Sequence, residues 1–340
     1  MQNQANATSE TKPMNLLHSK PTFVQLTKSP ELSPTLPSWV YRDPDVLDLE
    51  RECVFGRNWV FVAHVSEIAA GQSFHGDING EPLVLSRDHD GNLRAACSNP
   101  ASRDPAMRVE TLAGLVFVNR DTQATSLAVQ APGLEASIRG FIPDADALVK
   151  CHETVHEVAS NWKVLVENSL ECYHCEPCHP GFSTDVDMAH YRSVSDGIVT
   201  IHTSQRLHTP VKADDDLVDS DPVNKFMYWY VWPSTEIDAT PGEQPQLSIY
   251  TRKALGPDRH QLIGRYYRLP GDTLSSAERQ SFDEDATLLE DIAICEAVQR
   301  GLASRGYSQG RFIVDAERSH ISEHSVHHFQ CMVSDALDLR

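Results

Sequence analysis

One stretch of the chain, residues 161–182, concentrates two histidines, three glutamates and three cysteines. Apolar side chains recur at helical spacing through its first half, which predicts an amphipathic helix over residues 161–174. Glu167, Glu171 and His174 follow one another at i, i+4 and i+7, so this helix would stack two carboxylates above an imidazole. Such an arrangement can hold a proton or a metal ion, and the rest of the chain is expected to be its scaffold.

His174 and His179 are five positions apart, which on an ideal helix directs them roughly 140° from each other. They can converge only if the helix unwinds between them, and Pro177 and Pro180 provide such a break. Two neutral imidazoles with one carboxylate and open positions are typical of a non-haem Fe(II) site. The sequence therefore predicts a carboxylate ligand further along the chain.

Asp291 is the best candidate for that ligand. It lies on one helical stripe with four apolar side chains, Leu288, Cys295, Val298 and Leu302. A carboxylate in the middle of an apolar stripe must be paired or bound to a metal. Glu290 lies off this stripe and is the weaker candidate.

The candidate ligands belong to a series of short motifs: Asn161-Trp-Lys, Glu167-Asn168, Glu171-Cys-Tyr-His174, His179-Pro180, Glu290-Asp291 and Val298-Gln-Arg-Gly-Leu. This series resembles the catalytic domain of Rieske-type ring-hydroxylating oxygenase alpha subunits. The resemblance extends over roughly residues 41–340 and is nearest to the branch that oxidises quaternary ammonium compounds such as carnitine, glycine betaine and stachydrine. It implies the helix-grip fold of that catalytic domain and a homotrimeric assembly.

The resemblance also implies roles for individual residues. His174 and His179 match the iron-binding histidines of the family, and Asp291 matches its iron-binding carboxylate. Glu171 matches the acidic residue that links the iron site to the Rieske cluster of the neighbouring subunit. Glu176 matches an extra glutamate of the carnitine branch, so catalytic roles are expected for both glutamates.

The chain departs from the family pattern in its N-terminal third. A Rieske [2Fe–2S] centre needs an early Cys-x-His pair and a later Cys-x-x-His pair, and neither pair occurs there. Cys97 stands alone, Asn99 occupies the place of a histidine, and the sequence resumes at Met107 as if the cluster-bearing segment had been removed. The expected cofactor is therefore mononuclear Fe(II), while the ligands of the cluster that the family implies are not found.

These features predict a mononuclear non-haem iron oxygenase that hydroxylates or N-demethylates a small substrate with O₂, quaternary ammonium compounds being one candidate class. Its electrons would come from an external reductase or iron–sulfur protein, from a full-length paralogue in a mixed trimer, or from the substrate. One alternative is a catalytically silent helix-grip subunit with a ligand-binding or regulatory role. Another is an internally deleted or spliced form of a conventional oxygenase.

Two further sets of residues have open interpretations. Cys172, Cys175 and Cys178 could seed an iron–sulfur or zinc site, but a helix would point them to different faces, so incidental or buried thiols are favoured. Tyr228 and Tyr230 share one face of a predicted strand and are candidates for cation–π contacts to a substrate. Packing in the core or in a trimer interface is the favoured role for most of the aromatic residues of this strand.

The patterns along the chain predict an α+β fold. Residues 1–40 lack periodicity and are expected to be a disordered tail. Residues 41–122 contain a predicted helix followed by a small antiparallel β-domain, a trimmed Rieske-like domain, with hairpin signals at Asn79-Gly80 and within residues 88–91. Residues 123–150 form a connector, and residues 151–340 form the catalytic domain, an antiparallel sheet with a long C-terminal helix.

The formal charge of −19 argues against binding to nucleic acid or to an anionic membrane through a basic surface. The eight cysteines do not resemble the disulfide framework of a small secreted domain. The N-terminus has no apolar segment like the core of a signal peptide, and no apolar run reaches the length of a membrane span. The sequence therefore predicts a cytoplasmic protein.

Overall fold

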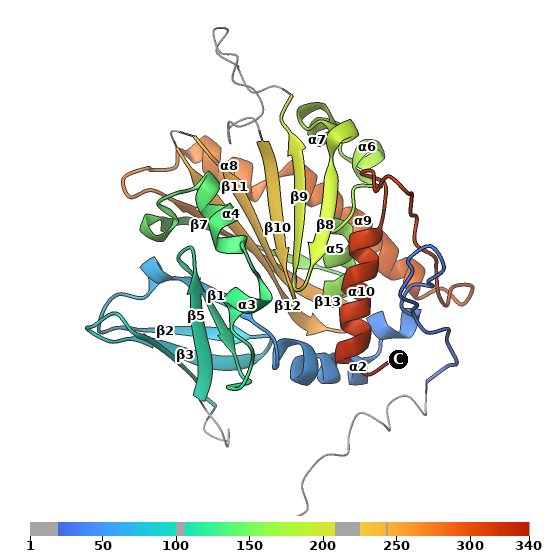
Figure 1. Ribbon diagram of the computed structural model, residues 1–340, viewed down its shortest axis with the longest axis horizontal. Helices are drawn as coiled ribbons and strands as arrows, with labels where there is room; N and C mark the ends of the chain where they lie inside the picture. The colour runs from blue at the N-terminus through green and yellow to red at the C-terminus, as the bar shows by residue number, and fades with distance from the viewer. Residues whose placement is uncertain (1–19, 100–105, 208–224, 243, 340) are drawn as a thin grey trace, which may run out of the picture.

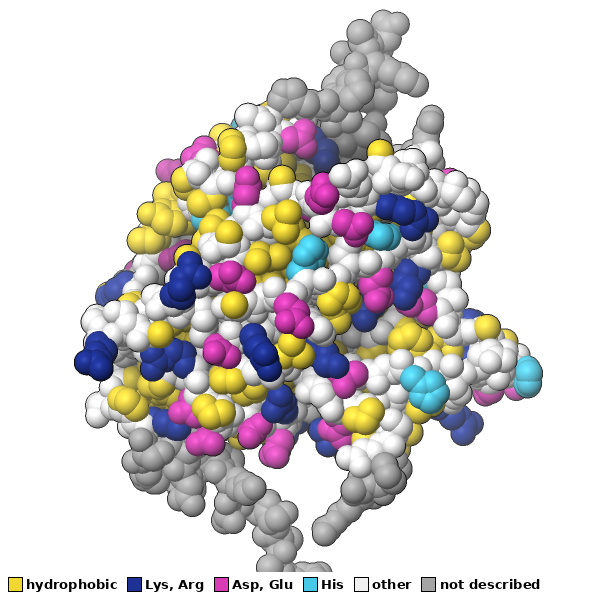
Figure 2. Space-filling view, turned by 180° about the vertical axis from the view of Figure 1, so that it is seen from behind, with side chains coloured by type: hydrophobic (Ala, Val, Ile, Leu, Met, Phe, Trp, Pro, Cys, Tyr) yellow, Lys and Arg dark blue, Asp and Glu magenta, His cyan; other side chains and the backbone are white. Residues whose placement is uncertain are grey.

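The computed structural model describes residues 20–99, 106–207, 225–242 and 244–339, which form two antiparallel sheets and their helices (Figure 1). The predicted α+β class is confirmed, as is a long C-terminal helix, α10 (His324–Ala336). Within these residues, no helix is both long enough and apolar enough to cross a membrane. Figure 2 shows acidic and basic side chains interspersed on the face opposite to that of Figure 1.

The smaller sheet has the strand order β1-β6-β5-β4-β3-β2. Asn79 and Gly80 both adopt positive φ angles, 48° and 99°, and form the predicted tight turn between β2 and β3. Residues 100–105, at the expected site of the missing cluster segment, lie outside the described residues; on either side of them β4 pairs with β5. The strands of this sheet are β1 (Val60–His64), β2 (Ser73–Ile78), β3 (Glu81–Arg87), β4 (Leu93–Cys97), β5 (Ala106–Leu112) and β6 (Leu115–Asn119).

A helix precedes this sheet. α2 (Pro44–Glu50) begins with Pro44 in its first turn, and the side chain of Asp43 accepts a hydrogen bond from the amide of Asp45. The helix continues as a π-helical turn, η2 (Arg51–Phe55). The larger part of the helix predicted between residues 44 and 59 is therefore present.

The larger sheet has the strand order β7-β13-β12-β11-β10-β9-β8. Alternation along β10 divides its side chains between two cores. Trp229 and Val231 pack with the small sheet and α4, while Tyr230 faces the opposite side. The strands are β7 (Val149–Val158), β8 (Arg192–Asp196), β9 (Val199–Gln205), β10 (Lys225–Val231), β11 (Thr235–Thr240), β12 (Gln246–Gly256) and β13 (Arg259–Arg268).

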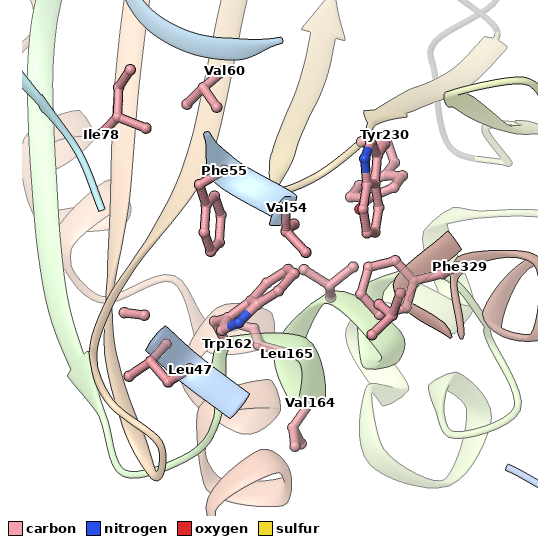
Figure 3. Close-up of a cluster of buried hydrophobic side chains, with 14 of the residues drawn as sticks. Leu47, Val54, Phe55, Val60, Ile78, Trp162, Val164, Leu165, Tyr230 and Phe329 are labelled. Atoms are coloured by element: carbon pink, nitrogen blue, oxygen red, sulfur yellow. The ribbon is translucent and has the colours of Figure 1, made fainter. Parts of the chain in front are cut away.

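Helices cover the other face of the larger sheet. Figure 3 shows Trp162, Tyr230 and Phe329 meeting in the core between α5, β10 and α10, with ring centroids 6.0 and 6.1 Å from that of Phe329. α9 packs against α5 and carries the distal acidic motif. The main helices are α3 (Leu127–Gln130), α4 (Leu134–Phe141), α5 (Trp162–Ser169), α6 (Cys175–Cys178), α7 (Pro180–Asp185), α8 (Ser276–Asp283) and α9 (Ala286–Leu302); short 3₁₀ turns are η1 (Ser38–Tyr41), η3 (Val65–Glu67), η4 (Ala145–Ala147) and η5 (Met188–His190).

The N-terminal segment differs from the expected disordered tail over residues 20–40; residues 1–19 lie outside the described residues. Leu36 is fully buried, and its amide donates a hydrogen bond to Oε1 of Gln330 on α10 at 2.6 Å. Trp39 and Tyr41 are also buried. A few large apolar side chains therefore fix this segment to the catalytic half, although its average composition is polar.

Candidate metal centre

The helix that begins the acidic and histidine-rich stretch is shorter than predicted. The side chain of Asn161 caps its start by accepting a hydrogen bond from the amide of Lys163 at 3.0 Å. α5 ends at Ser169, five residues before the predicted end, and the amide of Cys172 then bonds to the carbonyl of His320. The helix prediction is therefore wrong beyond residue 169, because a contact with a distant segment diverts the chain.

Glu171 and His174 consequently meet in a turn instead of along a helix face. Glu171 Oε2 accepts hydrogen bonds from the amides of Tyr173 and His174, and Oε1 lies 2.5 Å from His174 Nδ1. His179 lies between α6 and α7, and Pro180 begins α7 as expected of a break. Pro177 lies inside α6, so it does not provide the predicted break.

His174, His179 and Asp291 converge. Asp291 Oδ1 lies 3.2 Å from His174 Nε2 and 2.9 Å from His179 Nε2. One possible ligand atom from each residue lies within 4.8 Å of the others, and in the described ranges no other group of three acidic, histidine or cysteine side chains does so. The structure thus brings together the residues that the sequence predicts as ligands.

Two further carboxylates contact the Nδ1 atoms of the imidazoles, on the opposite side of each ring from Nε2. His174 Nδ1 contacts Glu171, and His179 Nδ1 lies 2.7 Å from Oε2 of Glu290. A carboxylate on Nδ1 fixes the ring and directs the lone pair of Nε2 toward a metal. Glu290, the weaker ligand candidate from the sequence, therefore has a supporting position beside His179.

The electrostatics of the cluster match a cation site. Burial opposes protonation of His174, but its hydrogen bonds to Asp291 and Glu171 outweigh burial and raise its pKa to about 10. The hydrogen bond to Asp291 likewise raises the pKa of His179. Binding of a divalent cation would replace these protons at the Nε2 atoms. Two imidazoles, one carboxylate and an open side form a donor set that fits Fe(II).

Asn168 also belongs to this centre, and sequence reasoning did not assign it a role. Its Nδ2 atom lies 3.2 Å from His174 Nε2, and the side chain projects from the last turn of α5. An amide donor is therefore present on the open side of the cluster. The occurrence of Asn168 in the Glu167-Asn168 motif was the sequence feature that could have indicated this role.

The cluster of His174, His179 and Asp291 opens into a cavity of about 330 Å³. Besides the cluster, the cavity wall combines aromatic and acidic side chains with apolar and small polar ones such as Leu165, Leu262 and Ser169. It includes Phe182, Tyr191, Phe226, Tyr228, Tyr250, Asp185, Glu236, Asp238 and Asp285, with two basic residues, Arg206 and Arg252. This combination favours a positively charged ligand that carries apolar groups.

Asp238 is the acidic residue in this wall whose buried carboxylate oxygen has no partner among the described residues, so a ligand could contact it. Glu236 forms a buried ion pair with Arg252, whereas Asp238 Oδ1 is shielded from solvent and has no hydrogen-bond partner among the described residues. Burial raises the pKa of Asp238 to about 6. Alternating acids in the strand sequence of β11 (Thr-Glu-Ile-Asp-Ala-Thr) place both carboxylates on one face, a signal that was overlooked.

The remaining predicted site residues lie at different depths. Tyr228 pairs with Asp238 across β10 and β11 and lines the cavity. Tyr230 is buried in the core instead, and its hydroxyl donates to the carbonyl of Pro233 at 2.5 Å. The side chain of Glu176 is 61% exposed, is not among the residues that line the cavity, and lies 3.6 Å from Nε2 of His320.

The three cysteines of residues 161–182 are in two different oxidation states. Cys172 and Cys175 form a disulfide, whereas Cys178 is a free thiol. The interpretation of incidental thiols is therefore wrong for the first two, since the early end of α5 places them in one turn instead of on different helix faces.

The carboxyl group of Glu167 is buried, and its protonation makes the stability of the fold depend on pH. Tyr41 donates a hydrogen bond to Glu167 Oε1 at 2.7 Å, and burial raises the pKa of Glu167 from 4.5 to about 7. Because the folded-state pKa is raised, the stabilisation is complete below pH 4.5 and is lost as the pH rises through 7.

Glu167→Gln, which keeps an acceptor for Tyr41, is therefore expected to raise the free energy of unfolding at pH 8 by roughly 1–3 kcal/mol. At pH 4.5 the expected difference from the parent chain is small. Urea denaturation at the two pH values checks this. An equal effect at both would show that the ionisation of Glu167 is not the cause.

Three comparisons with known proteins show what this chain is similar to. A model of the family "ring hydroxylating alpha subunit (catalytic domain)" matches residues 145–339. The carnitine monooxygenase oxygenase subunit of Escherichia coli (strain K12) is 29% identical over 358 residues, which cover 90% of this chain and 94% of that protein. The chloroplastic choline monooxygenase of Arabidopsis thaliana is 24% identical over 369 residues, covering 91% of this chain and 84% of that protein.

Among solved structures, that of a quaternary ammonium Rieske monooxygenase matches with a TM-score of 0.76 and 25% identity, covering 91% of this chain and 96% of that chain. That structure is described as giving insights into carnitine oxidation by gut microbiota and inter-subunit electron transfer. Both sequence alignments are longer than this 340-residue chain, so they include positions where the relative has residues and this chain has none.

Proposed function

This chain belongs to the family of ring-hydroxylating oxygenase alpha subunits, as its motifs predict, and from that membership we propose a specific activity. The protein is a mononuclear non-haem Fe(II) oxygenase that hydroxylates or N-demethylates a small quaternary ammonium compound with O₂. One observation carries this proposal: the His174, His179 and Asp291 cluster opens into a cavity with an acidic and aromatic wall.

The residues of the centre have distinct parts in this activity. The Nε2 atoms of His174 and His179 and the carboxylate of Asp291 would hold Fe(II), whose chemistry when bound is the activation of O₂. Glu171 and Glu290 keep the two imidazoles in the orientation that ligation needs. The Asn168 amide supplies a hydrogen-bond donor beside the ligands.

The cavity wall selects the substrate. Aromatic faces such as that of Tyr228 attract a quaternary ammonium group, which cannot donate a hydrogen bond. Asp238 adds a negative charge that no described side chain neutralises by direct contact. A cation held between this wall and the metal-binding cluster would have its methyl groups and neighbouring carbons beside the metal.

Ligand binding to the metal-loaded chain tests this proposal. Choline is expected to bind at least about tenfold more tightly than 3,3-dimethylbutan-1-ol, its uncharged carbon analogue, a difference of about 1.4 kcal/mol. Binding should strengthen as the pH rises through about 6, since Asp238 then becomes charged. Asp238→Asn should weaken cation binding and remove this pH dependence, with Asp258→Asn, in the β12–β13 turn, as the matched control. Carnitine and glycine betaine complete the panel, and equal affinity for the charged and uncharged ligands would contradict the proposal.

Electron supply and assembly are further parts of the proposal. A reductase or iron–sulfur protein supplies electrons to a homotrimer, or a full-length paralogue does so within a mixed trimer, in the cytoplasm. Inter-subunit electron transfer is the subject of one related structure, which supports this arrangement. Residues 41–122 are then a remnant of a Rieske domain, and the exposed carboxylate of Glu176 is available for contact with a partner.

The absence of Cys-x-His and Cys-x-x-His pairs from the N-terminal third favours one second candidate, a subunit that binds the cation without turning it over. Oxygen uptake in the presence of substrate and a reductase separates the two. Cation binding without substrate-dependent oxygen uptake would favour the silent subunit.

A further inference from the structure

A disulfide flanks one of the proposed iron ligands. Cys172 and Cys175 lie on either side of His174, with Cα atoms 4.9 Å apart, and the amide of Cys175 donates to the carbonyl of Cys172. The bond links residues only three positions apart. A loop this short loses little freedom on closure, so the disulfide adds less to stability than one that closes a long loop. Its position therefore suggests a chemical role.

Both cysteines face the reaction space. They line the same cavity as His174, His179 and Asp291. They are nevertheless only 1% and 5% exposed, within an apolar cluster that includes Val186, Met188 and Tyr191. The cysteines thus have little contact with bulk solvent and lie in the wall of the cavity that also contains the metal-binding cluster. In a reducing compartment, disulfides are usually transient and catalytic or redox-sensing.

We propose that Cys172 and Cys175 are a dithiol–disulfide couple that supplies the two electrons and two protons of one oxygenation. This inference rests on the proposed oxygenase function and names an electron source within the chain, as an alternative to the protein donors proposed above. A dithiol that becomes a disulfide gives up two electrons and two protons. Insertion of one oxygen atom of O₂ into a C–H bond, with reduction of the other to water, consumes the same number.

The reaction therefore balances. A substrate C–H bond, O₂ and the dithiol give the C–OH product, water and the Cys172–Cys175 disulfide. The O–O bond breaks, a C–O and an S–S bond form, and the two thiol hydrogens end in water. An external thiol or dithiol reductant then restores the pair by exchange, and it is oxidised in turn.

A single-turnover experiment tests the inference. The chain is reduced with dithiothreitol without oxygen, freed of reductant, loaded with Fe(II) and choline, exposed to O₂, and then unfolded in urea and treated with iodoacetamide, so that the buried thiols react as well. The tryptic peptide of residues 164–192 contains all three cysteines of the stretch. It should carry three labels before oxygen and one, on Cys178, afterwards. About one disulfide should form per product molecule, and metal-free protein should oxidise at least tenfold more slowly.

Variants separate this role from a structural one. Cys178→Ser, which removes the free thiol, should leave single turnover unchanged. The double variant Cys172→Ser/Cys175→Ser should retain iron but lose product formation without a donor, and dithionite with a redox mediator should restore it. Two outcomes would overturn this inference without affecting the proposed oxygenase function. One is that the double variant forms as much product as the parent chain in the absence of a donor. The other is that the parent chain turns over while its peptide still carries three labels. A parent chain that retains iron but forms no product with any donor would overturn the proposed oxygenase function as well.

A measurement on the metal-free protein is independent of activity. In buffers of reduced and oxidised glutathione, the labelling of the 164–192 peptide should change reversibly between one and three labels. A pair that cannot be reduced in the folded chain would contradict its use as a recurring electron source.

Discussion

Asp291→Ala is expected to abolish iron retention in this chain. Asp291 Oδ1 is the shared partner of His174 Nε2 and His179 Nε2, so its removal leaves two imidazoles without the carboxylate that completes the donor set. Loss of a supporting residue in a metal site weakens affinity by about 10- to 100-fold, and loss of a direct ligand should cost more. Iron content after anaerobic loading and desalting measures the effect.

Glu290→Gln is the matched control, because it changes the next residue on α9 and removes only the charge that holds His179 Nδ1. It should weaken iron binding within the about 10- to 100-fold range and leave the fold intact. Parental iron content in Asp291→Ala, or an equal loss in both variants, would contradict the division between ligand and supporting residue.

Glu50→Ala should have the largest effect on stability. Glu50 Oε1 lies 2.5 Å from Lys163 Nζ with both side chains fully buried, and Glu50 Oε2 accepts a hydrogen bond from Trp162 Nε1 at 2.8 Å. Removal of the carboxylate leaves a buried ammonium group without its counter-charge. We expect the free energy of unfolding to fall by about 3–5 kcal/mol, as measured by urea denaturation.

Two controls identify the cause of that loss. Asp48→Ala breaks a solvent-exposed ion pair with Arg51 on the same helix, and should cost less than about 1 kcal/mol. Glu50→Ala/Lys163→Met removes both buried charges and should recover much of the stability. A similar cost for the two single variants would show that the buried pair does not anchor α2 to α5.

The residues whose convergence the sequence predicted are those whose local pattern is sufficient. An acid within an apolar stripe indicated that Asp291 faces inward, and Pro180 marked the start of a new helix after His179, although Pro177 does not break the chain between the two histidines. The smaller sheet followed from turn residues such as Asn79-Gly80, whose positive φ angles are a local property.

The positions of the residues that sequence reasoning missed are determined by contacts with distant parts of the chain. The end of α5 is set by a bond from Cys172 to the His320 segment, and this bond also determines that Cys172 meets Cys175. Strand alternation correctly puts Tyr228 and Tyr230 on one face, but only the position along β10 determines which tyrosine reaches the cavity. Leu36 packs on α10 because of a residue almost three hundred positions away, which composition cannot reveal.

Metal and sulfide analysis of the parent chain tests the central claim most directly. The protein would be purified without oxygen, loaded with Fe(II), desalted and examined by iron assay, acid-labile sulfide assay and visible absorption. The account predicts about one iron per chain, no sulfide and no absorption bands of a cluster. Two or more additional irons with sulfide, or no retained iron, would contradict a mononuclear centre at His174, His179 and Asp291.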